Sequence, residues 1–260
     1  MVKKIPKKVY TTAYWWEKEL NFGDLLTPLM LRHFTETEPV HSGPNNPQVV
    51  LVGSVLDSIP SENYAGIVAG SGMLHCRTRV NLSNAHVLGL RGRLTEQNCS
   101  RIRQTDYVLG DPGLLSSELV YTERDKHQLG IVPHWTDKEL FKKELAMSEK
   151  YGYATPILID PAQDPIKVIK LIGSCKKIVS SSLHGIIIAD SFNLPRRTET
   201  FPAMFSSKYE GTKFKFEDYS SVINQPIEFG VLQEAPKVII DTRKAELFDM
   251  FKELKGILHV

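Results

Sequence analysis

The sequence predicts an α/β protein with two doubly wound halves, in which helices cover both faces of a parallel sheet. Two observations support this prediction: short, β-branched apolar runs end at Gly, Pro, Asp or Ser, and helical patterns lie between them. The polar segment 119–128 (LVYTERDKHQ) separates the two series and predicts a linker between the halves. Because such halves bind ligands in a crevice outside the carboxyl ends of their strands, functional residues are expected in the loops that follow the strands.

Each predicted strand is a continuous apolar run, as expected for a strand that is buried on both faces of a parallel sheet. A first strand is expected around residues 9–13. The later strands are each closed by a turn residue, and they occupy residues 49–52, 66–69, 85–88, 107–109, 129–132, 156–159 and 177–179.

Helices are expected between and after these strands. Asp24 can cap the first of them, Pro165 stands at a first-turn position where its missing N–H costs nothing, and Asp241 or Thr242 would cap the last. The predicted helices span residues 25–34, 94–101, 137–151, 165–174, 184–192 and 241–255. Residues 196–211 lack periodicity and predict a mobile loop near the cleft.

The composition is that of a globular protein with one large domain or two small ones. The chain has 260 residues, of which 42% are hydrophobic and 24% charged, which excludes disordered and fibrous proteins. The domain boundaries expected are 1–122, 123–240 and a C-terminal helix over 241–260. Lys+Arg number 32 against 30 for Asp+Glu, and this net charge of +2 argues against a nucleic-acid-binding protein.

The sequence predicts a soluble, cytoplasmic protein. No run approaches the ~20 apolar residues of a membrane span, and the basic N-terminus lacks the apolar segment of a signal peptide. The lysines at positions 3, 4, 7 and 8 would favour an anionic membrane surface, although a solvated tail is the simpler interpretation. The 3 cysteines are far apart and form no CxxC, so reduced thiols are expected rather than disulfides or a zinc site.

Loops of the first half carry polar residues that suit a small ligand. Asn21, Gly23 and Asp24 stand at the entry to a helix, where a glycine lets the backbone approach a ligand. An ordinary capped turn would contain the same residues. Ser54 and Ser71 each follow a glycine at the ends of successive strands, but the third glycine and the acidic residue of a dinucleotide fingerprint are missing, which excludes a nicotinamide cofactor.

Two further loops of the first half carry charge. Arg91 and Arg93 stand at a strand-to-helix junction, where two guanidinium groups would clamp a carboxylate or a phosphate. Simple surface solvation explains them equally well. Asp111, in the sequence GDPG, belongs to a tight turn, can also hold a partner loop or an arginine, and is a candidate substrate-binding residue.

The most informative motif is SSSLHGI at residues 180–186, between a strand and an apolar helix. The backbone N–H groups of such a turn point at whatever fills the loop. With the hydroxyls of Ser180, Ser181 and Ser182 they predict a phosphate cradle, and the titratable His184 stands beside it. His134, after another strand, is either a structural donor or a catalyst. The GxSxG, HExxH and P-loop motifs are absent, which argues against serine hydrolases, metalloproteases and simple NTPases.

The order of these motifs resembles the polysaccharide pyruvyl transferase family, and within it the ketal pyruvyl transferases of the xanthan type. The motifs are NFGD, GSVL, GSG, RGRLT, GDPGLL, IVPH, SSSLHGIIIAD and FKFEDY, and they cover about residues 10–219. GDPGLL followed by SSSLHG is specific, whereas NFGD alone is not. The resemblance implies a glycosyltransferase-B-like fold with two Rossmann-like halves and a cleft between them, the acceptor on the N-terminal side and the donor on the C-terminal side.

The resemblance also implies the substrates. The enolpyruvyl group of phosphoenolpyruvate would move to a hydroxyl pair of a sugar, forming a pyruvate ketal and releasing phosphate, with no cofactor and no metal. The acceptor would be a bacterial exopolysaccharide or lipid-linked oligosaccharide precursor, which would bring the enzyme to the inner face of the membrane. Many members carry an arginine before Leu-His-Gly, where this chain has Ser182. Arg91, Arg93, Lys213 and Lys215 are the expected substitutes, in that order.

Ketal formation needs an acid and a base with tuned pKa values. We expect His184 to hold the donor phosphate or to act as the acid, Asp24 to be the base toward the acceptor hydroxyl, and His134 to be a reserve. Trp15 and Trp16 point to opposite sides of an extended chain. Trp15 is the candidate that would stack on the acceptor sugar.

Two alternatives remain open at this point. A nucleotide-sugar-dependent glycosyltransferase of the same fold would hold a diphosphate at the serine turn and a ribose at Glu217 or Asp218. A catalytically inactive carbohydrate-binding subunit would keep the cleft alone. The sequence gives no oligomeric state.

Overall fold

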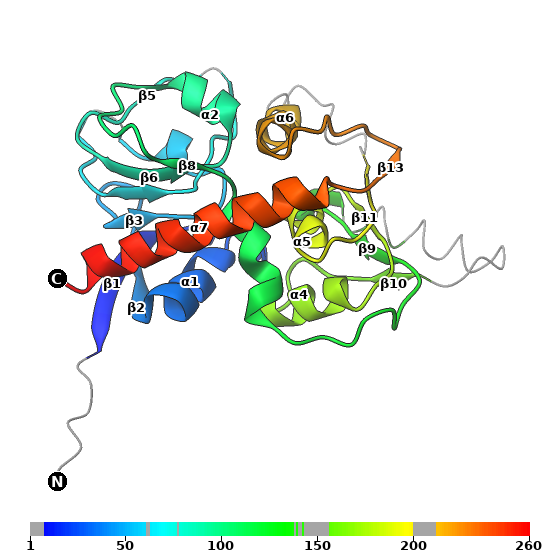
Figure 1. Cartoon of the computed structure of the whole chain (residues 1–260). Coiled ribbons are helices and arrows are strands. Elements are labelled where there is room, and N and C mark those ends of the chain that lie inside the picture. Colours follow the sequence, from blue (N-terminus) through cyan, green and yellow to red (C-terminus); the bar gives the residue numbers. More distant parts are fainter. Residues whose placement is uncertain are drawn as a thin grey trace, which may run out of the picture.

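The computed structural model describes residues 8–60, 63–76, 78–137, 139, 142, 156–199 and 212–260, and it confirms an α/β protein with largely parallel sheets (Figure 1). One sheet is parallel throughout and has 6 strands, in the order β2 (Thr37–His41), β1 (Val9–Tyr14), β3 (Val49–Val50), β4 (Ile67–Ala69), β6 (His86–Leu90) and β8 (Val108–Leu109). All the apolar runs that predict strands in this half are confirmed.

The second main sheet has 5 strands, in the order β10 (Ile157–Leu158), β9 (Gly130–Val132), β11 (Ile178–Ser180), β12 (Arg196–Thr198) and β13 (Leu232–Gln233). Its strands are parallel except for β13, which pairs antiparallel with β12. A small parallel pair joins β5 (Val80–Asn81) to β7 (Cys99–Ser100). The apolar runs of the second half are therefore confirmed as well, while β12 replaces the start of the loop predicted over 196–211.

The helices are α1 (Leu26–Met30), α2 (Arg93–Asn98), α4 (Pro165–Gly173), α5 (Leu183–Ser191), α6 (Thr212–Ile223) and α7 (Lys237–Leu258). Helices α4 and α5 match their predicted ranges within one residue. The helix α7 begins a full turn before the predicted caps, directly after Pro236, so Asp241 lies inside it and accepts a hydrogen bond from Lys237 Nζ at 2.5 Å. Most of the helix predicted over 137–151, and residues 200–211, lie outside the described residues.

The strands β2, β5, β7, β12 and β13 and the helix α6 escaped prediction, and in two of these elements, β2 and α6, local patterns pointed elsewhere. The strand β2 contains Pro39, which cannot donate to a sheet, but β2 is an edge strand, where proline is tolerated. In α6 the residues Lys213 to Phe216 alternate charged and aromatic, as a strand would. In the helix, Phe214 and Phe216 are nevertheless both buried, since α6 packs against α2 and α7.

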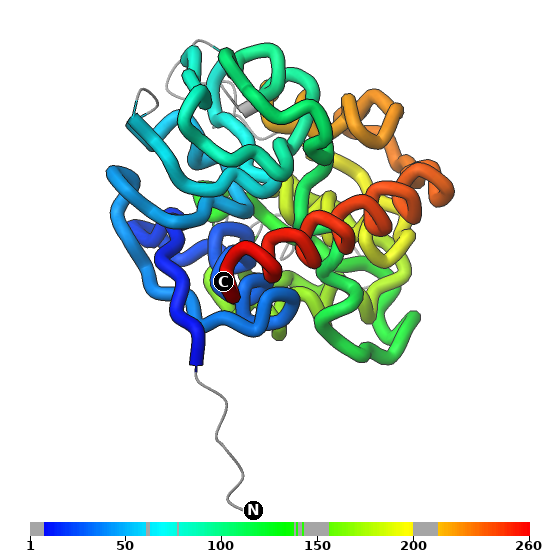
Figure 2. The backbone as a smooth tube through the Cα atoms, turned by 60° about the vertical axis from the view of Figure 1, so that its left-hand side comes forward, coloured from blue at the N-terminus to red at the C-terminus, as the bar shows by residue number. Residues whose placement is uncertain are grey.

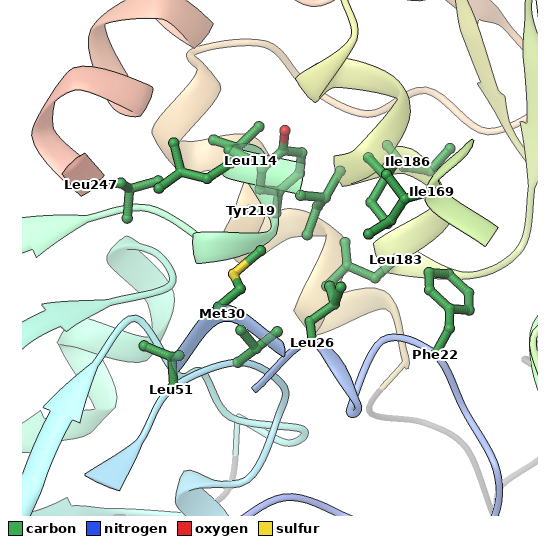
Figure 3. Close-up of a cluster of buried hydrophobic side chains, with 14 of the residues drawn as sticks. Phe22, Leu26, Met30, Leu51, Leu114, Ile169, Leu183, Ile186, Tyr219 and Leu247 are labelled. Atoms are coloured by element: carbon green, nitrogen blue, oxygen red, sulfur yellow. The ribbon is translucent and has the colours of Figure 1, made fainter. Parts of the chain in front are cut away.

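One hydrophobic cluster contains side chains from both main sheets and from the segments that follow their strands. Figure 3 shows part of it, including Phe22, Leu26, Met30, Leu51, Leu114, Ile169, Leu183, Ile186, Tyr219 and Leu247. The last helix, α7, runs across the molecule from the second sheet's side to the first, where it packs on β6 and β8 (Figures 1 and 2). The loops at the carboxyl ends of the two sheets are thereby held next to each other.

Among the helices that the structure describes, none combines the length and the apolar character that crossing a bilayer would demand.

Candidate functional site

A pocket of about 240 Å³ lies where loops of both sheets meet α6. The loops that line it follow β1, β3, β4, β9 and β11, so they stand at the carboxyl ends of parallel strands, as the fold class predicts. The lining residues are Trp16, Asn21, Asp24, Ser54, Val55, Ser58, Leu74, His134, Trp135, Ser182, Leu183, His184 and Lys215. The pocket therefore brings together many of the site residues that the sequence predicts.

The carboxyl group of Asp24 is free to face the pocket because it does not cap a helix. The N-cap position of α1 is Leu25, and Asp24 Oδ2 instead accepts a hydrogen bond from Asn21 Nδ2 at 2.8 Å. Burial raises the pKa of Asp24 to about 6, although Asn21 and the charge of Lys215 oppose the rise. Gly53 has a φ of +102°, and a Cβ there would stand 3.0 Å from Asp24 Oδ1, so this glycine makes room for the carboxyl group.

His184 occupies the first turn of α5 and packs tightly against the loop that carries Asp24. A Cβ at Gly23 would collide with His184 Nδ1, so this position requires a glycine for steric reasons. Burial, together with smaller effects of the positive charges of Arg91 and Lys215, lowers the pKa of His184 to about 3. The imidazole of the ligand-free protein is therefore neutral at neutral pH.

Asp111 lies behind His184 and does not line the pocket. Its Oδ1 accepts a hydrogen bond from Gly113 N at 2.8 Å, and its Oδ2 lies 3.8 Å from His184 Nε2. Both Oδ2 and Nε2 are buried, and neither has a hydrogen-bond partner in the described part of the chain. Burial raises the pKa of Asp111 to about 6. The structure thus places Asp111 against the histidine, where the sequence predicted a residue that binds substrate.

Lys215 reaches the pocket from α6 and is almost completely buried. Burial lowers its pKa to about 8, and the charge of Arg91 adds to this effect, while the carboxylates of Asp24 and Asp137 oppose it. Of the described residues that line the pocket, Lys215 alone carries an ammonium or guanidinium group. It would supply the positive charge for an anionic ligand.

Arg91, the first expected substitute for the missing arginine, is fully buried and fully engaged. Its guanidinium donates to Asp218 Oδ2 at 2.9 Å, to Ser54 Oγ at 2.6 Å and to Met73 O at 2.6 Å. Asp218 also accepts from the backbone N–H and the hydroxyl of Thr95. Arg91 therefore ties the first sheet to α6 and lies behind the pocket wall at Ser54. The same contacts occupy Asp218, which the alternative glycosyltransferase would need for a ribose.

A sequence profile of the polysaccharide pyruvyl transferase family matches residues 8–196. The chain belongs to this family. It is accordingly a transferase enzyme, and its activity is pyruvyl transfer to polysaccharide. The resemblance stated from the order of the motifs is confirmed.

Two relatives and one solved structure are similar to this pyruvyl transferase. The uncharacterized protein L143 of Acanthamoeba polyphaga mimivirus is 30% identical over 226 residues, which cover 83% of this chain and 75% of that protein. The succinoglycan biosynthesis protein ExoV of Rhizobium meliloti (strain 1021) is 26% identical over 242 residues, covering 88% and 68%. An alpha1,3-fucosyltransferase with GDP aligns over 97% and 92% of the two chains at 9% identity, with a TM-score of 0.24, too low to support a statement about the fold. Because one relative is viral, similarity does not restrict this chain to bacteria.

Other residues predicted for the site of this pyruvyl transferase lie elsewhere. Arg93 lines a separate surface pocket beside Tyr107 and Arg243. Lys213 pairs with Glu217 across 3.1 Å on the outer face of α6. Ser71 Oγ donates to Gly53 O at 2.9 Å and is buried. Of the four cations expected to replace the arginine, the structure brings only Lys215, the last in the expected order, to the described lining of the pocket.

The serine turn is built differently from the phosphate cradle that the sequence predicts. Ser180 Oγ donates to Val132 O at 2.7 Å and accepts from Ser182 N at 3.0 Å. Ser181 Oγ donates to Asp137 Oδ2 at 2.8 Å. These two hydroxyl groups are buried inside the turn and are used in shaping it. Ser182, at the N-cap of α5, lines the pocket.

His134 lines the pocket and belongs to a closed ring of hydrogen bonds. Its Nδ1 lies 2.8 Å from Thr136 Oγ1, which donates to Asp137 Oδ1 at 3.0 Å. The ring closes because the backbone N–H of His134 donates to Ser181 Oγ at 2.8 Å. Burial lowers the pKa of His134 to about 3, with a smaller effect from Lys215. This ring fixes the loop after β9 onto the serine turn, and sequence reasoning missed Asp137 because its role depends on this contact.

The tryptophans that line the pocket are not the one that the sequence favoured. Trp15 is 8% exposed and packs edge-on against His41, with ring centroids 4.6 Å apart. Trp16 is 36% exposed and Trp135 is 38% exposed, and both line the pocket. The alternation along the chain does place the two adjacent indoles on opposite sides, but Trp15 faces the core. Trp135 was missed although it directly follows His134.

Proposed function

We propose that this chain transfers the enolpyruvyl group of phosphoenolpyruvate to two hydroxyl groups of one sugar, forming a cyclic pyruvate ketal and releasing phosphate. The observation that carries the proposal is that Asp24, His184 and Lys215 line one pocket. Phosphoenolpyruvate has a phosphate and a carboxylate, so its site needs a cation and hydrogen-bond donors. Lys215 would provide the cation, and the first turn of α5 at Leu183 and His184 would provide backbone N–H groups.

In this proposal Lys215 replaces the arginine that many family members carry at the position of Ser182. Its pKa of about 8 leaves most of the side chain protonated at neutral pH. A bound dianion would raise that pKa, because an opposite charge nearby favours the ammonium form. The same dianion would raise the pKa of His184 from about 3 toward the working range, so binding of the donor would turn a neutral imidazole into an acid.

The first step joins the sugar to the donor. Asp24, as the carboxylate, takes the proton from the first hydroxyl group, whose oxygen bonds to C2 of phosphoenolpyruvate. The imidazolium of His184 gives a proton to C3, so the methylene becomes a methyl group. The product of this step is a tetrahedral carbon that carries phosphate, carboxylate, methyl and the sugar oxygen.

The second step closes the ketal. The C2–O bond to phosphate breaks, and protonated Asp24 gives its proton to the departing phosphate oxygen. The second hydroxyl bonds to the oxocarbenium-like carbon and gives its proton to His184, so both residues return to their starting states. Lys215 and the N-terminus of α5 would stabilise the departing charge, and a fixed cation and helix dipole can do so without a metal or a cofactor.

Asp111 would position His184 in this reaction. A neutral imidazole that directs its Nε2–H at Asp111 Oδ2 leaves Nδ1 as its proton-accepting atom. The Nε2 to Oδ2 distance is 3.8 Å, and such contacts tighten when substrate binds. His134, held in its ring of hydrogen bonds, would shape the pocket wall.

The acceptor is proposed to be an exopolysaccharide or lipid-linked oligosaccharide precursor. The support for this comes from the family, which acts on polysaccharide, and from the relative that is named for succinoglycan biosynthesis. A lipid-linked acceptor would be met in the cytoplasm at the inner face of a membrane.

Calorimetry of phosphoenolpyruvate binding tests the donor. We expect Lys215→Met to weaken binding by at least tenfold, because a buried cation–anion contact is lost. Lys213→Met is the matched control, since it removes a lysine from the outer face of the same helix and should leave binding unchanged. His184→Ala should abolish phosphate release in the presence of acceptor while leaving the fold intact by circular dichroism. Binding of nucleotide sugars in place of phosphoenolpyruvate, or equal effects of the two lysine variants, would overturn the donor assignment.

A further inference from the structure

The pocket is too small to hold the donor together with a whole glycan. Its volume of about 240 Å³ is below the range of roughly 300–1,000 Å³ that is typical of ligand pockets. Under the proposed function it receives phosphoenolpyruvate at Lys215 and the reacting hydroxyl pair at Asp24. The rest of the acceptor must therefore leave the pocket along the protein surface.

A second cavity adjoins the pocket at Trp135. It has a volume of about 370 Å³ and shares Trp135 with the pocket. We call it the outer groove, and its lining residues are Glu17, Lys18, Glu19, Leu20, Trp135, Asp160, Pro161 and Ala162. Because Trp135 lines both cavities, a chain that leaves the pocket past this indole enters the outer groove.

A backbone hydrogen bond joins the two walls of the outer groove. One wall is the segment 17–20 after β1, and the other is the segment 160–162 after β10, so each sheet supplies one side. The backbone N–H of Phe22 donates to Pro161 O at 2.8 Å and joins the two segments. Asp160 Oδ1 accepts from Ala162 N at 3.0 Å and fixes the turn in the second wall. A groove that is formed before binding costs less ordering entropy when a ligand enters.

The lining chemistry suits a neutral sugar chain. Trp135 and Trp16 present partly exposed indole rings near the junction, and aromatic faces pack against the C–H faces of sugar rings. Among the described residues that line the groove, three carboxylates stand against one ammonium group, Lys18, whose Nζ lies 5.2 Å from the Trp16 ring centre, and Lys142, outside the lining, interacts with Asp160. Carboxylates accept hydrogen bonds from hydroxyl groups and repel anions. Uronic acids and phosphates are disfavoured here, whereas neutral polyols are not.

We propose that the outer groove binds the sugars next to the one that receives pyruvate, so that the acceptor is an oligosaccharide of neutral sugars. This rests on the proposed function, which places the reacting hydroxyls in the inner pocket. It specifies an acceptor longer than a monosaccharide and without acidic sugars at the positions adjoining the reaction.

Binding of glycans in the absence of any donor tests this inference. The probes are methyl β-glucoside, cellobiose and cellotetraose, the corresponding galactose series, and tetragalacturonate as the anionic counterpart, each titrated by calorimetry. In at least one neutral series the tetrasaccharide should bind about tenfold or more tightly than the methyl glycoside, and tetragalacturonate should bind more weakly than either tetrasaccharide. Equal affinities within both neutral series, or preferred binding of tetragalacturonate, would overturn the proposal.

Variants at two groove residues, Leu20 and Trp135, show whether the groove is responsible for the gain in affinity. Leu20→Ala changes a residue that lines the outer groove and not the pocket, and it should weaken tetrasaccharide binding about 3- to 10-fold while leaving the methyl glycoside unchanged. Leu232→Ala removes another exposed leucine, on β13, and should have no effect. Trp135→Ala should remove most of the advantage of the tetrasaccharide, and Trp135→Phe should restore part of it. Unchanged tetrasaccharide affinity in both Leu20→Ala and Trp135→Ala would remove the groove from acceptor binding.

The donor assignment and the groove assignment fail separately. Phosphoenolpyruvate binding, measured without glycan, should be the same in Leu20→Ala as in the unaltered protein. A protein that binds cellotetraose tightly through the groove but fails to bind phosphoenolpyruvate would keep the groove and lose the proposed donor. The reverse result would keep the donor and overturn the groove.

Discussion

The two walls of the pocket carry different chemistry. The wall from the first sheet holds a carboxyl group, Asp24, fixed by Asn21, whereas the wall from the second sheet and α6 holds the nitrogen groups of His184, His134 and Lys215. Burial moves every one of these groups toward its neutral form, with pKa values of about 6 for Asp24, 8 for Lys215 and 3 for the two imidazoles. The first wall suits proton removal from a hydroxyl and the second suits an anion. Neither sheet alone therefore supplies both the carboxyl group for proton removal and the cation for an anionic ligand.

The largest effect on this comparison is expected when the first wall loses its base. Asp24→Asn keeps the size of the side chain but cannot take a proton, so kcat should fall by about 10²- to 10⁴-fold. Phosphoenolpyruvate binding should persist, because the cation on the other wall is unchanged. Steady-state phosphate release and calorimetry measure the two quantities. A variant that retains a tenth of the activity would show that the walls do not divide the reaction in this way.

The next effect concerns the ion pair between Arg91 and Asp218, which joins the first sheet to α6. Arg91→Met leaves Asp218 as a buried charge without its guanidinium partner, so the free energy of unfolding should fall by about 3–5 kcal/mol. Arg93→Met, two residues away and exposed, should change it by less than about 0.5 kcal/mol. Urea unfolding followed by circular dichroism compares the two variants. Similar midpoints for both would mean that Arg91 does not hold α6 to the first sheet.

Sequence patterns predicted the sheets well because buried parallel strands leave continuous apolar runs that end in turn residues. They also pointed to Asp24, His134 and His184, which line the pocket, since each lies between a strand and the next helix or in the first turn of that helix. They could not rank Lys215 above Arg91, because that order depends on which side of α6 faces the pocket and on the distant partner Asp218. Tertiary contacts decided these assignments.

A smaller effect is expected from Asp111→Asn, which leaves both walls in place but removes the carboxylate behind His184. We expect kcat to fall by about tenfold with little change in KM for phosphoenolpyruvate, and the pH profile to shift. A purely packing role would leave the pH profile unchanged. The groups that face His184 and would share in the shift are Asp111, Arg91 and Lys215.

The same variant should be more stable than the unaltered protein at alkaline pH. The folded-state pKa of Asp111 is raised from 3.8 to about 6, so the folded state binds the proton more tightly, and stability is lost as the pH rises between these values. Asparagine does not ionise, so at pH 8 Asp111→Asn should be more stable by roughly 1–3 kcal/mol, and this advantage should vanish below about pH 4. Thermal unfolding at the two pH values tests the sign.

The smallest effect is expected in the pH dependence of the unaltered protein. If the carboxylate of one wall and the ammonium group of the other are both required, kcat/KM for phosphoenolpyruvate should follow a bell-shaped curve. The acid limb should lie near the Asp24 pKa of about 6 and the alkaline limb near the Lys215 pKa of about 8. Lys215→Arg should move the alkaline limb upward and leave the acid limb in place. An alkaline limb that stays fixed in this variant would separate Lys215 from the ionisation.

The course of α7 has a consequence for how the chain folds as it is made. This helix follows every other described element along the chain, yet Leu247, Met250 and Phe251 pack into the core beside β6 and β8, and His259 Nε2 donates to Thr35 O at 2.7 Å. Most nascent proteins complete their N-terminal parts first. Here the first sheet would wait, with part of its apolar surface uncovered, until α7 has been synthesised. A ribosome stalled before residue 237 would hold a chain that exposes this surface and should recruit chaperones.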